Sequence, residues 1–254
     1  MADPSRLDAG LRATLVLVRH GESTWVAEGR FQGRGDPPPS SLGRRQAALV
    51  ALRLADPGAE LSLSGHPPSG IWHSPLQRAA TTAEAIAAAR SPAPPLRSDD
   101  GLSEIDQGEW QGLTHDEVRA RWASTLEAWR DDPTSCEAPG GERLLDAQLR
   151  VRDALSRIIA AFDPAERSDG LTVGDSAAVP WTIVVAHDGV LRLALMALLG
   201  VPITRFWSFQ FVLCGISVVQ IAEGRTILRA HNVAHHLAPL AAFGKPSHDR
   251  EGAL

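Results

Sequence analysis

The chain has 254 residues, 44% of them apolar, and is long enough to bury roughly three quarters of its unfolded surface in a single core. Its formal net charge of −5, with 25 basic residues spread along the chain, argues against a nucleic-acid-binding protein. The two cysteines, Cys136 and Cys214, lack zinc-ligand spacing and cannot form a disulfide framework. No signal-peptide core or membrane-length apolar stretch is present, so we expect a cytoplasmic protein that does not contact membranes.

Short apolar runs alternate with helical patterns along the chain. Three runs rich in β-branched residues predict strands at 14–18, 181–186 and 216–222. Helix signals are found at the N-cap candidates Ser40 and Ser41, at Pro75 in a first helical position, at a Thr114 and Glu117 capping box, along 151–162, and near Gly189. The segments 56–70 and 163–180 have the composition of loops.

This alternation predicts one α/β domain. No linker separates two apolar patterns, so we expect a single-domain three-layer sandwich whose mostly parallel central sheet has helices on both faces. The domain is expected over residues 14–240, between a flexible N-terminal tail at 1–13 and a C-terminal tail at 241–254.

Two of the predicted strands end at a histidine. The first runs into Arg19 and His20, and the strand at 181–186 runs into His187 just before a helix start. In an open α/β sheet the ligand crevice lies beyond the carboxyl ends of the strands, so both histidines are expected in one site. Arg78 lies in the first turns of a predicted helix and Glu104 in a glycine-rich loop. Two arginines, two histidines and a carboxylate together predict a phosphate pocket with an acid beside it.

Six strings, LVRHGES, FQGRGDPPPSSLGRRQA, SPLQRAATTAEAIA, LSEIDQGEWQGLT, PGGE and VAHDGVLR, occur in this order along the chain. In order and spacing the chain resembles the histidine phosphatase superfamily, the phosphoglycerate mutase-like proteins, over most of its length. The resemblance implies that His20 attacks phosphorus and forms a phosphohistidine. Arg19, Arg78 and His187 would bind the phosphate, and Glu104 would protonate the leaving group and then activate water. No metal and no cofactor is implied.

The resemblance also suggests residues on the substrate side of the pocket. Gln32 and Gly33 match the family's substrate-adjacent pair, and Trp110 beside the Glu104 loop is expected to contact substrate. Many relatives have asparagine where this chain has Val26. We therefore expect Ser23, Thr24 or Gln32 to supply the missing hydrogen bond to phosphate.

A second departure follows the second histidine. Relatives commonly have glycine at the position of Asp188, and a carboxylate aimed at a phosphate dianion would repel it. We expect Asp188 to turn aside, where it would cap the helix start and hold His187 protonated.

Three functions are compatible with these motifs. The favoured one is a phosphatase acting on a small phosphorylated metabolite. A 2,3-bisphosphoglycerate-dependent phosphoglycerate mutase is the alternative, but the chain contains no tyrosine and lacks the mutases' Glu-Arg-x-Tyr-Gly string. The lid candidate 114–142 carries three arginines against seven carboxylates, the wrong sign for retaining a bisphosphate. An inactive binding module is disfavoured because all five core residues are present. The sequence motifs do not decide whether the chain forms a homodimer.

Overall fold

The computed structural model of the chain describes residues 11–56, 61, 63, 66–162 and 179–243. The predicted loop 163–180 therefore lies outside the described residues except at 179–180, and the predicted loop 56–70 is described only at 56, 61, 63 and 66–70. Most of both predicted tails also lies outside the described residues. None of the helices in the described ranges is long and apolar enough to cross a membrane.

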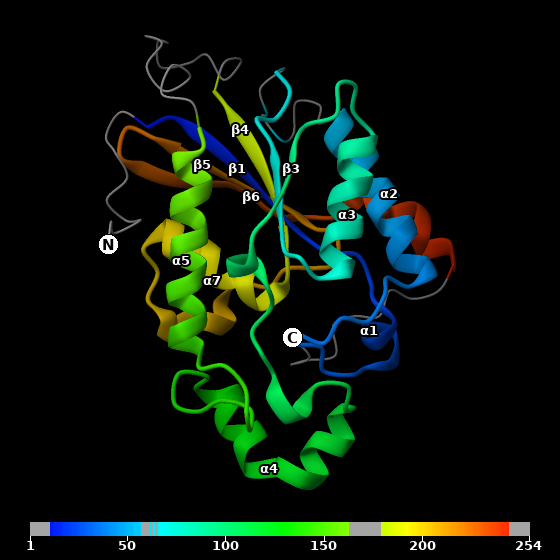
Figure 1. Ribbon diagram of the computed structural model, residues 1–254, viewed down its shortest axis with the longest axis vertical. Coiled ribbons are helices and arrows are strands. Elements are labelled where there is room, and N and C mark those ends of the chain that lie inside the picture. Colours follow the sequence, from blue (N-terminus) through cyan, green and yellow to red (C-terminus); the bar gives the residue numbers. More distant parts are fainter. Residues whose placement is uncertain (1–10, 57–60, 62, 64–65, 163–178, 244–254) are drawn as a thin grey trace.

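A six-stranded sheet forms the centre of the fold (Figure 1). Its strands are β1 (Ala13–Arg19), β2 (Ile71–His73), β3 (Leu96–Ser98), β4 (Trp181–Ala186), β5 (Ile216–Ala222) and β6 (Arg225–Val233). They are arranged in the order β3-β2-β4-β1-β5-β6. Neighbours from β3 to β1 are parallel, whereas β5 is antiparallel to both β1 and β6. The sheet is therefore mixed and mostly parallel, as the sequence predicts.

Helices cover both faces of this sheet. They are α1 (Thr24–Glu28), α2 (Ser41–Ala55), α3 (Gln77–Ala88), α4 (His115–Asp131), α5 (Leu144–Ala160) and α7 (Asp188–Leu199), with short 3-10 helices at Asp100–Leu102, Gly108–Trp110, Ile203–Ser208 and His235–Phe243. In Figure 1, α5 and α7 lie on the left of the sheet and α2 and α3 on the right.

The apolar residues of β1 divide between two cores. Leu15 and Leu17 belong to the cluster that includes α5 and α7, whereas Val16 and Val18 belong to the cluster that includes α2 and α3. Successive side chains of a strand point to opposite faces, so a strand covered on both sides reads as a continuous apolar run. This packing confirms the three-layer sandwich.

The predicted helix starts are largely confirmed. The Ser40 hydroxyl accepts the N–H of Gly43, and Thr114 with Glu117 forms a reciprocal capping box. The start predicted at Pro75 is wrong, because α3 begins at Gln77. Ser74 does not cap that helix, although its hydroxyl accepts the N–H of Leu76.

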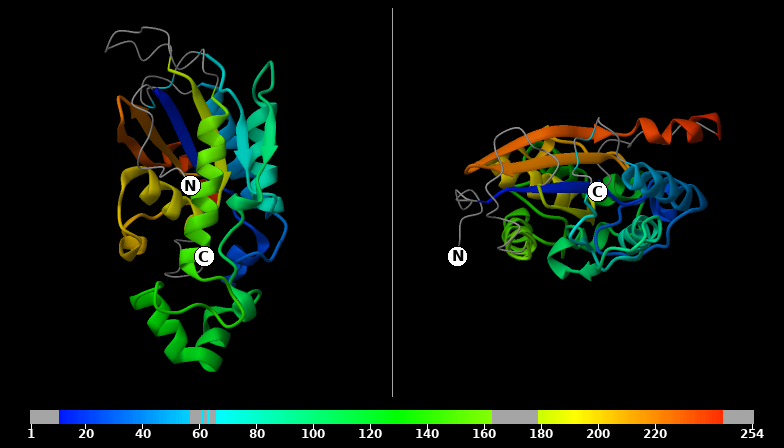
Figure 2. Two further views of the ribbon diagram at one scale, coloured as in Figure 1. Left: turned by 60° about the vertical axis from the view of Figure 1, so that its left-hand side comes forward. Right: turned by 90° about the horizontal axis from the view of Figure 1, so that it is seen from above.

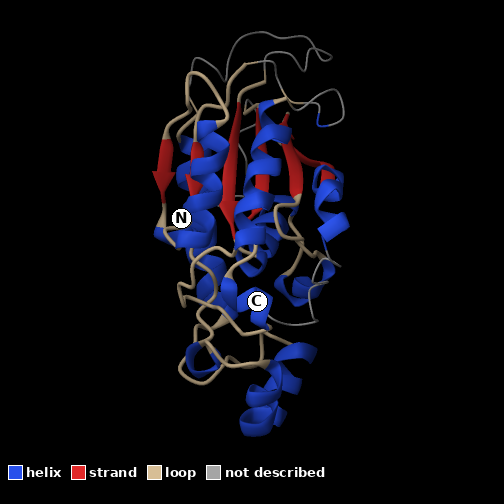
Figure 3. Cartoon of the chain, turned by 90° about the vertical axis from the view of Figure 1, so that its right-hand side faces the viewer, coloured by secondary structure: helices blue, strands red, loops and turns tan. Residues whose placement is uncertain are grey.

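The carboxyl ends of β1, β2 and β4 meet at one edge of the sheet, because these strands are parallel. Helix α4 lies beyond that edge in the side views (Figures 1, 2 and 3). Its backbone leaves helical geometry at Trp122, with φ −138° and ψ 45°, so α4 consists of two pieces with a kink between them. The predicted lid is thus a bent helix placed over the ends of the strands.

Candidate active site

His20 follows β1 directly and is 1% exposed. Its Nδ1 lies 2.7 Å from the carbonyl oxygen of Gly21, which only accepts, so Nδ1 carries the proton and Nε2 is the free base. Burial lowers the pKa of His20 well below its ordinary 6.5, and the cations of Arg78 and Arg19 lower it further. The imidazole is therefore neutral near pH 7, with its Nε2 lone pair available for attack.

Gly21 makes the histidine's position possible. A Cβ at Gly21 would lie 2.5 Å from the carbonyl oxygen of Gly43, and a Cβ at Gly43 would lie 1.9 Å from the carbonyl oxygen of Glu22. Only glycines allow the start of α2 to approach the exit of β1 this closely. This contact is the physical reason for a glycine after His20.

Two buried arginines lie near His20. Arg19 donates from Nη1 to the carbonyl oxygen of Phe211 at 2.6 Å. Arg78 donates from Nη1 and Nη2 to the carbonyl oxygens of Gly35 and Gly33, both at 2.8 Å. Burial lowers the pKa of Arg78 to about 10, so it remains a cation at neutral pH. A guanidinium has five N–H donors, and Arg78 uses two of them in these bonds, which leaves donors for a phosphate.

His187 stands beside His20, with ring centroids 5.0 Å apart. Its Nε2 is 2.8 Å from the hydroxyl oxygen of Ser74, which already accepts the N–H of Leu76 at 3.2 Å. The Ser74 O–H can donate to Nε2, and in that tautomer Nδ1 of His187 carries the proton. That Nδ1 is buried and has no hydrogen-bond partner among the described residues. In this tautomer Nδ1 is a donor beside the nucleophile.

Burial also lowers the pKa of His187 well below 6.5, with Arg78 the next cause. The ring is therefore neutral near pH 7 and offers a dipole rather than a charge. Sequence reasoning found His187 but assigned no role to Ser74, although Ser74 opens the string that contains Arg78.

Glu104 is 2% exposed and meets the N-terminus of α7. Its Oε1 accepts the N–H of Ile105 at 3.0 Å and of Val190 at 3.2 Å, and its Oε2 accepts the N–H of Gly189 at 3.3 Å. Burial raises the pKa of Glu104 above its ordinary 4.5; the Ile105 N–H opposes this, and the negative charge of Asp188 adds to it. Three backbone N–H groups thus hold the Glu104 carboxyl group in place, and its raised pKa favours the protonated form.

The loop that carries Glu104 is held by Arg150 on α5. Arg150 donates to the carbonyl oxygens of Gly101, Ser103 and Glu104, at 2.9, 2.6 and 3.1 Å. It also forms a bidentate pair with Glu142, at 2.7 and 2.8 Å. Glu142 belongs to the PGGE string, but nothing in the sequence marks Arg150 as important to the site.

The residues expected beside Val26 are tied to one another. Ser23 gives its hydroxyl proton to Oε1 of Gln32 at 2.5 Å and accepts the N–H of Val26 at 3.2 Å. With Oε1 of Gln32 occupied by Ser23, the amide Nε2 of Gln32 and the hydroxyl of Thr24 are the donors of this group that could serve a phosphate. Thr24 has a backbone bond to Pro38 at 3.0 Å.

Trp110 is 0% exposed and packs in the core, with its ring centroid 5.4 Å from that of Phe31, and its contact with substrate stays a prediction. The expected effect of Asp188 on His187 is not supported. Asp188 does turn aside, but its carboxylate pairs with Arg192 and the N–H of Phe211, and His187 is neutral rather than protonated. The cation one helical turn further along α7 is the stronger partner for that carboxylate.

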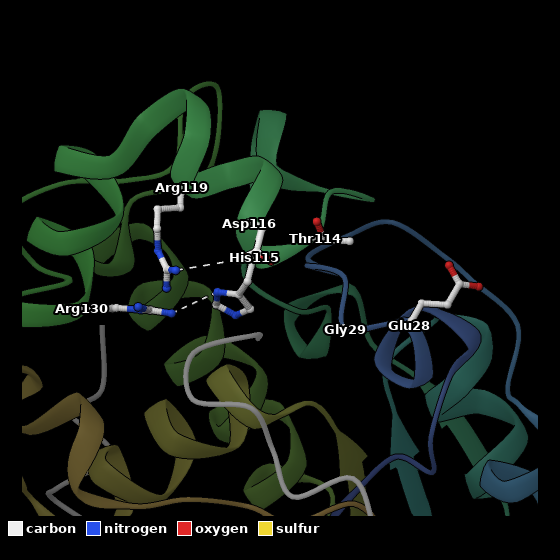
Figure 4. A pocket seen from close by; sticks show the side chains of 7 residues that line it. All are labelled: Glu28, Gly29, Thr114, His115, Asp116, Arg119 and Arg130. Carbon is white, nitrogen blue, oxygen red and sulfur yellow. Dashed lines mark hydrogen bonds and ion pairs between the residues drawn. The ribbon is translucent and has the colours of Figure 1, made fainter.

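A pocket of about 430 Å³ lies between α1 and α4, and neither His20 nor His187 lines it (Figure 4). Its lining residues are Glu28, Gly29, Thr114, His115, Asp116, Arg119 and Arg130. Arg130 lies 3.0 Å from Nδ1 of His115, and Arg119 pairs with Asp116 at 3.7 Å. Within the described ranges, no group of three or more His, Cys, Asp or Glu side chains is arranged to hold a metal ion.

Comparison with known proteins identifies the family to which this arrangement of histidines, arginines and a glutamate belongs. The model of the histidine phosphatase superfamily (branch 1) matches residues 15–234. The chain belongs to this superfamily. It is 33% identical over 223 residues to phosphoserine phosphatase 1 of Hydrogenobacter thermophilus, covering 88% of this chain and 93% of that one. It is 34% identical over 209 residues to the glucosyl-3-phosphoglycerate phosphatase of Mycolicibacterium vanbaalenii, covering 82% and 83%.

Solved structures of histidine phosphatases share the fold. A mycobacterial glucosyl-3-phosphoglycerate phosphatase in complex with VO3 matches with a TM-score of 0.72 and 28% identity, covering 87% of this chain and 99% of that one. These matches confirm the predicted family, the α/β fold and the phosphatase class.

Proposed function

We propose that this histidine phosphatase hydrolyses a small phosphomonoester through a phosphohistidine at His20, with its own arginines supplying the positive charge. The observation that carries the proposal is the His20 ring: Nδ1 is bound to the Gly21 carbonyl, and the pKa is lowered. A buried imidazole fixed in this tautomer has its nucleophilic nitrogen free at neutral pH.

In the first step, Nε2 of His20 attacks phosphorus and the bond to the leaving oxygen breaks. Arg19 and Arg78 neutralise the charge on the phosphoryl oxygens, and Nδ1 of His187 donates to one of them. The leaving alkoxide takes the proton of Glu104, whose raised pKa keeps that proton available.

In the second step, ionised Glu104 removes a proton from water, whose oxygen attacks phosphorus as the bond to His20 breaks. Inorganic phosphate forms, Glu104 is protonated again and His20 returns to its neutral form. The three backbone N–H groups that hold Glu104 stabilise its ionised form between the two steps.

The remainder of the substrate is proposed to contact the lid. The pocket between α1 and α4 carries Arg119 and Arg130, and α1 begins four residues after His20. At 1.5 Å per residue, α1 spans roughly 8 Å, within reach of a small metabolite. Arg119→Ala and Arg130→Ala are therefore expected to change KM across a panel of phosphomonoesters and to leave the ranking by leaving-group chemistry intact.

A paired assay on one preparation tests the reaction. Phosphate release is measured with EDTA present, and mutase turnover is measured with 2,3-bisphosphoglycerate and enolase coupling. We expect phosphate release and negligible interconversion of 2- and 3-phosphoglycerate, and we expect phosphate release to be lost in His20→Ala. Mutase turnover above the best phosphatase turnover, or more than a few per cent activity in His20→Ala, would contradict the proposal.

A cytoplasmic location and a homodimer, both raised by the sequence, are kept as proposals. Cell fractionation tests the first, and light scattering on a size-exclusion column tests the second.

A further inference from the structure

Asp188 and Arg192 form a buried ion pair on the first turns of α7. Nη2 of Arg192 donates to Oδ2 of Asp188 at 2.7 Å, and the two side chains are only 6% and 8% exposed. The guanidinium also lies over the rings of Phe206 and Trp207, 5.6 and 5.2 Å from their centroids. A buried charge left without its partner is strongly unfavourable, so each side chain fixes the other in this place.

The second oxygen of Asp188 reaches the segment that precedes β5. Oδ1 accepts the backbone N–H of Phe211 at 2.9 Å. The carbonyl oxygen of the same residue accepts Nη1 of Arg19 at 2.6 Å. Phe211 lies outside any helix or strand, so no ladder of backbone hydrogen bonds holds it. The Phe211 ring is buried in the core and packs against His231, while its backbone is hydrogen-bonded to Asp188 through the N–H and to Arg19 through the carbonyl oxygen.

We propose that the Asp188–Arg192 pair positions Arg19 for phosphate, acting through the backbone of Phe211. The inference rests on the proposed function, in which Arg19 grips a phosphoryl oxygen. Both oxygens of Asp188 face these protein donors, so the carboxylate stays away from the phosphate it would repel. Asp188 and Arg192 are therefore positioning residues rather than catalytic ones.

Calorimetric titration with inorganic phosphate tests this without turnover. Asp188→Ala and Arg192→Met are expected to weaken phosphate binding about tenfold or more, the loss typical of one misplaced charge-assisted hydrogen bond. Arg192→Lys keeps the cation and should recover most of that affinity. Asp188→Asn keeps an acceptor for the Phe211 N–H and should fall between wild type and Asp188→Ala.

Leu54→Ala is the matched control, because Leu54 is fully buried on α2 in the other core cluster. It should lower the melting temperature and leave the Kd for phosphate within about twofold of wild type. The same weakening in Leu54→Ala would show that the effect is loss of stability and would overturn the inference. Folded Asp188 and Arg192 variants with wild-type affinity would do so too.

If Asp188→Ala fails to fold, Asp188→Asn and Arg192→Met decide between the same outcomes: weakened phosphate binding supports the positioning role, and wild-type affinity in both contradicts it. A wild-type protein that binds no phosphate would contradict the proposed function itself. Wild-type binding with unchanged variants would contradict only the positioning role.

Discussion

Replacing Glu104 by glutamine is expected to separate the two halves of the reaction. The variant keeps the shape of the side chain but can neither donate nor remove the proton. Oε1 of Glu104 accepts two N–H groups, whereas Oε2 accepts only the longer bond from Gly189, at 3.3 Å. A glutamine that places its NH2 toward Gly189 loses that one bond, about 1 kcal/mol of stability. Loss of general acid catalysis costs far more, about 10²- to 10⁴-fold in rate.

The assay compares an alkyl phosphate with p-nitrophenyl phosphate, whose leaving group needs no proton. For the alkyl substrate, kcat/KM should fall by about 10²- to 10⁴-fold. For the aryl substrate, a burst of nitrophenolate equal to the enzyme concentration should precede slow turnover, because water attack lacks its base. Acid-labile phosphoenzyme should accumulate during this burst.

The pH profile supplies a second readout. Glu104 acts in its protonated form, and burial raises its pKa. For the alkyl substrate, wild-type kcat/KM is therefore expected to fall as pH rises through that raised pKa, and Glu104→Gln should lack this limb. Equal losses on both substrates without a burst, or alkyl kcat/KM within about tenfold of wild type, would refute the assignment.

Three further substitutions test the supports of the site. In Gly189→Ala the new Cβ would lie 2.8 Å from Oε1 of Glu104, so the carboxyl must move and kcat should fall about 10²-fold at a similar melting temperature; unchanged kcat would contradict this. Ser74→Ala frees the tautomer of His187, and kcat should drop about tenfold, with a wild-type rate as the contrary result. Arg150→Met leaves Glu142 with its charge poorly matched and should cost about 3 kcal/mol in urea unfolding; a loss under about 1 kcal/mol would argue against a holding role.

Several features of the fold followed from local patterns. β1, β4 and β5 were predictable because each is a run of apolar, largely β-branched residues, and the caps of α2 and α4 because Ser40 and Thr114 stand just before their helices. β2 and β3 escaped prediction because three residues are too short to show a period. The start of α3 was misplaced because Pro75 matched a helix signal that the chain does not use there.

For the site, the sequence by itself determined the candidate residues, because each stands beside a strand end, a helix start or a glycine whose position is readable along the chain. His20 and His187 came together because parallel strands end at the same edge of a sheet. Tertiary structure alone decided which donor faces which acceptor. Asp188 forms hydrogen bonds with Arg192 and with the backbone of Phe211, and Ser74 is hydrogen-bonded to His187, 113 positions away in the sequence. Such bonds depend on side-chain direction and burial, which arise only when distant segments pack and exclude water.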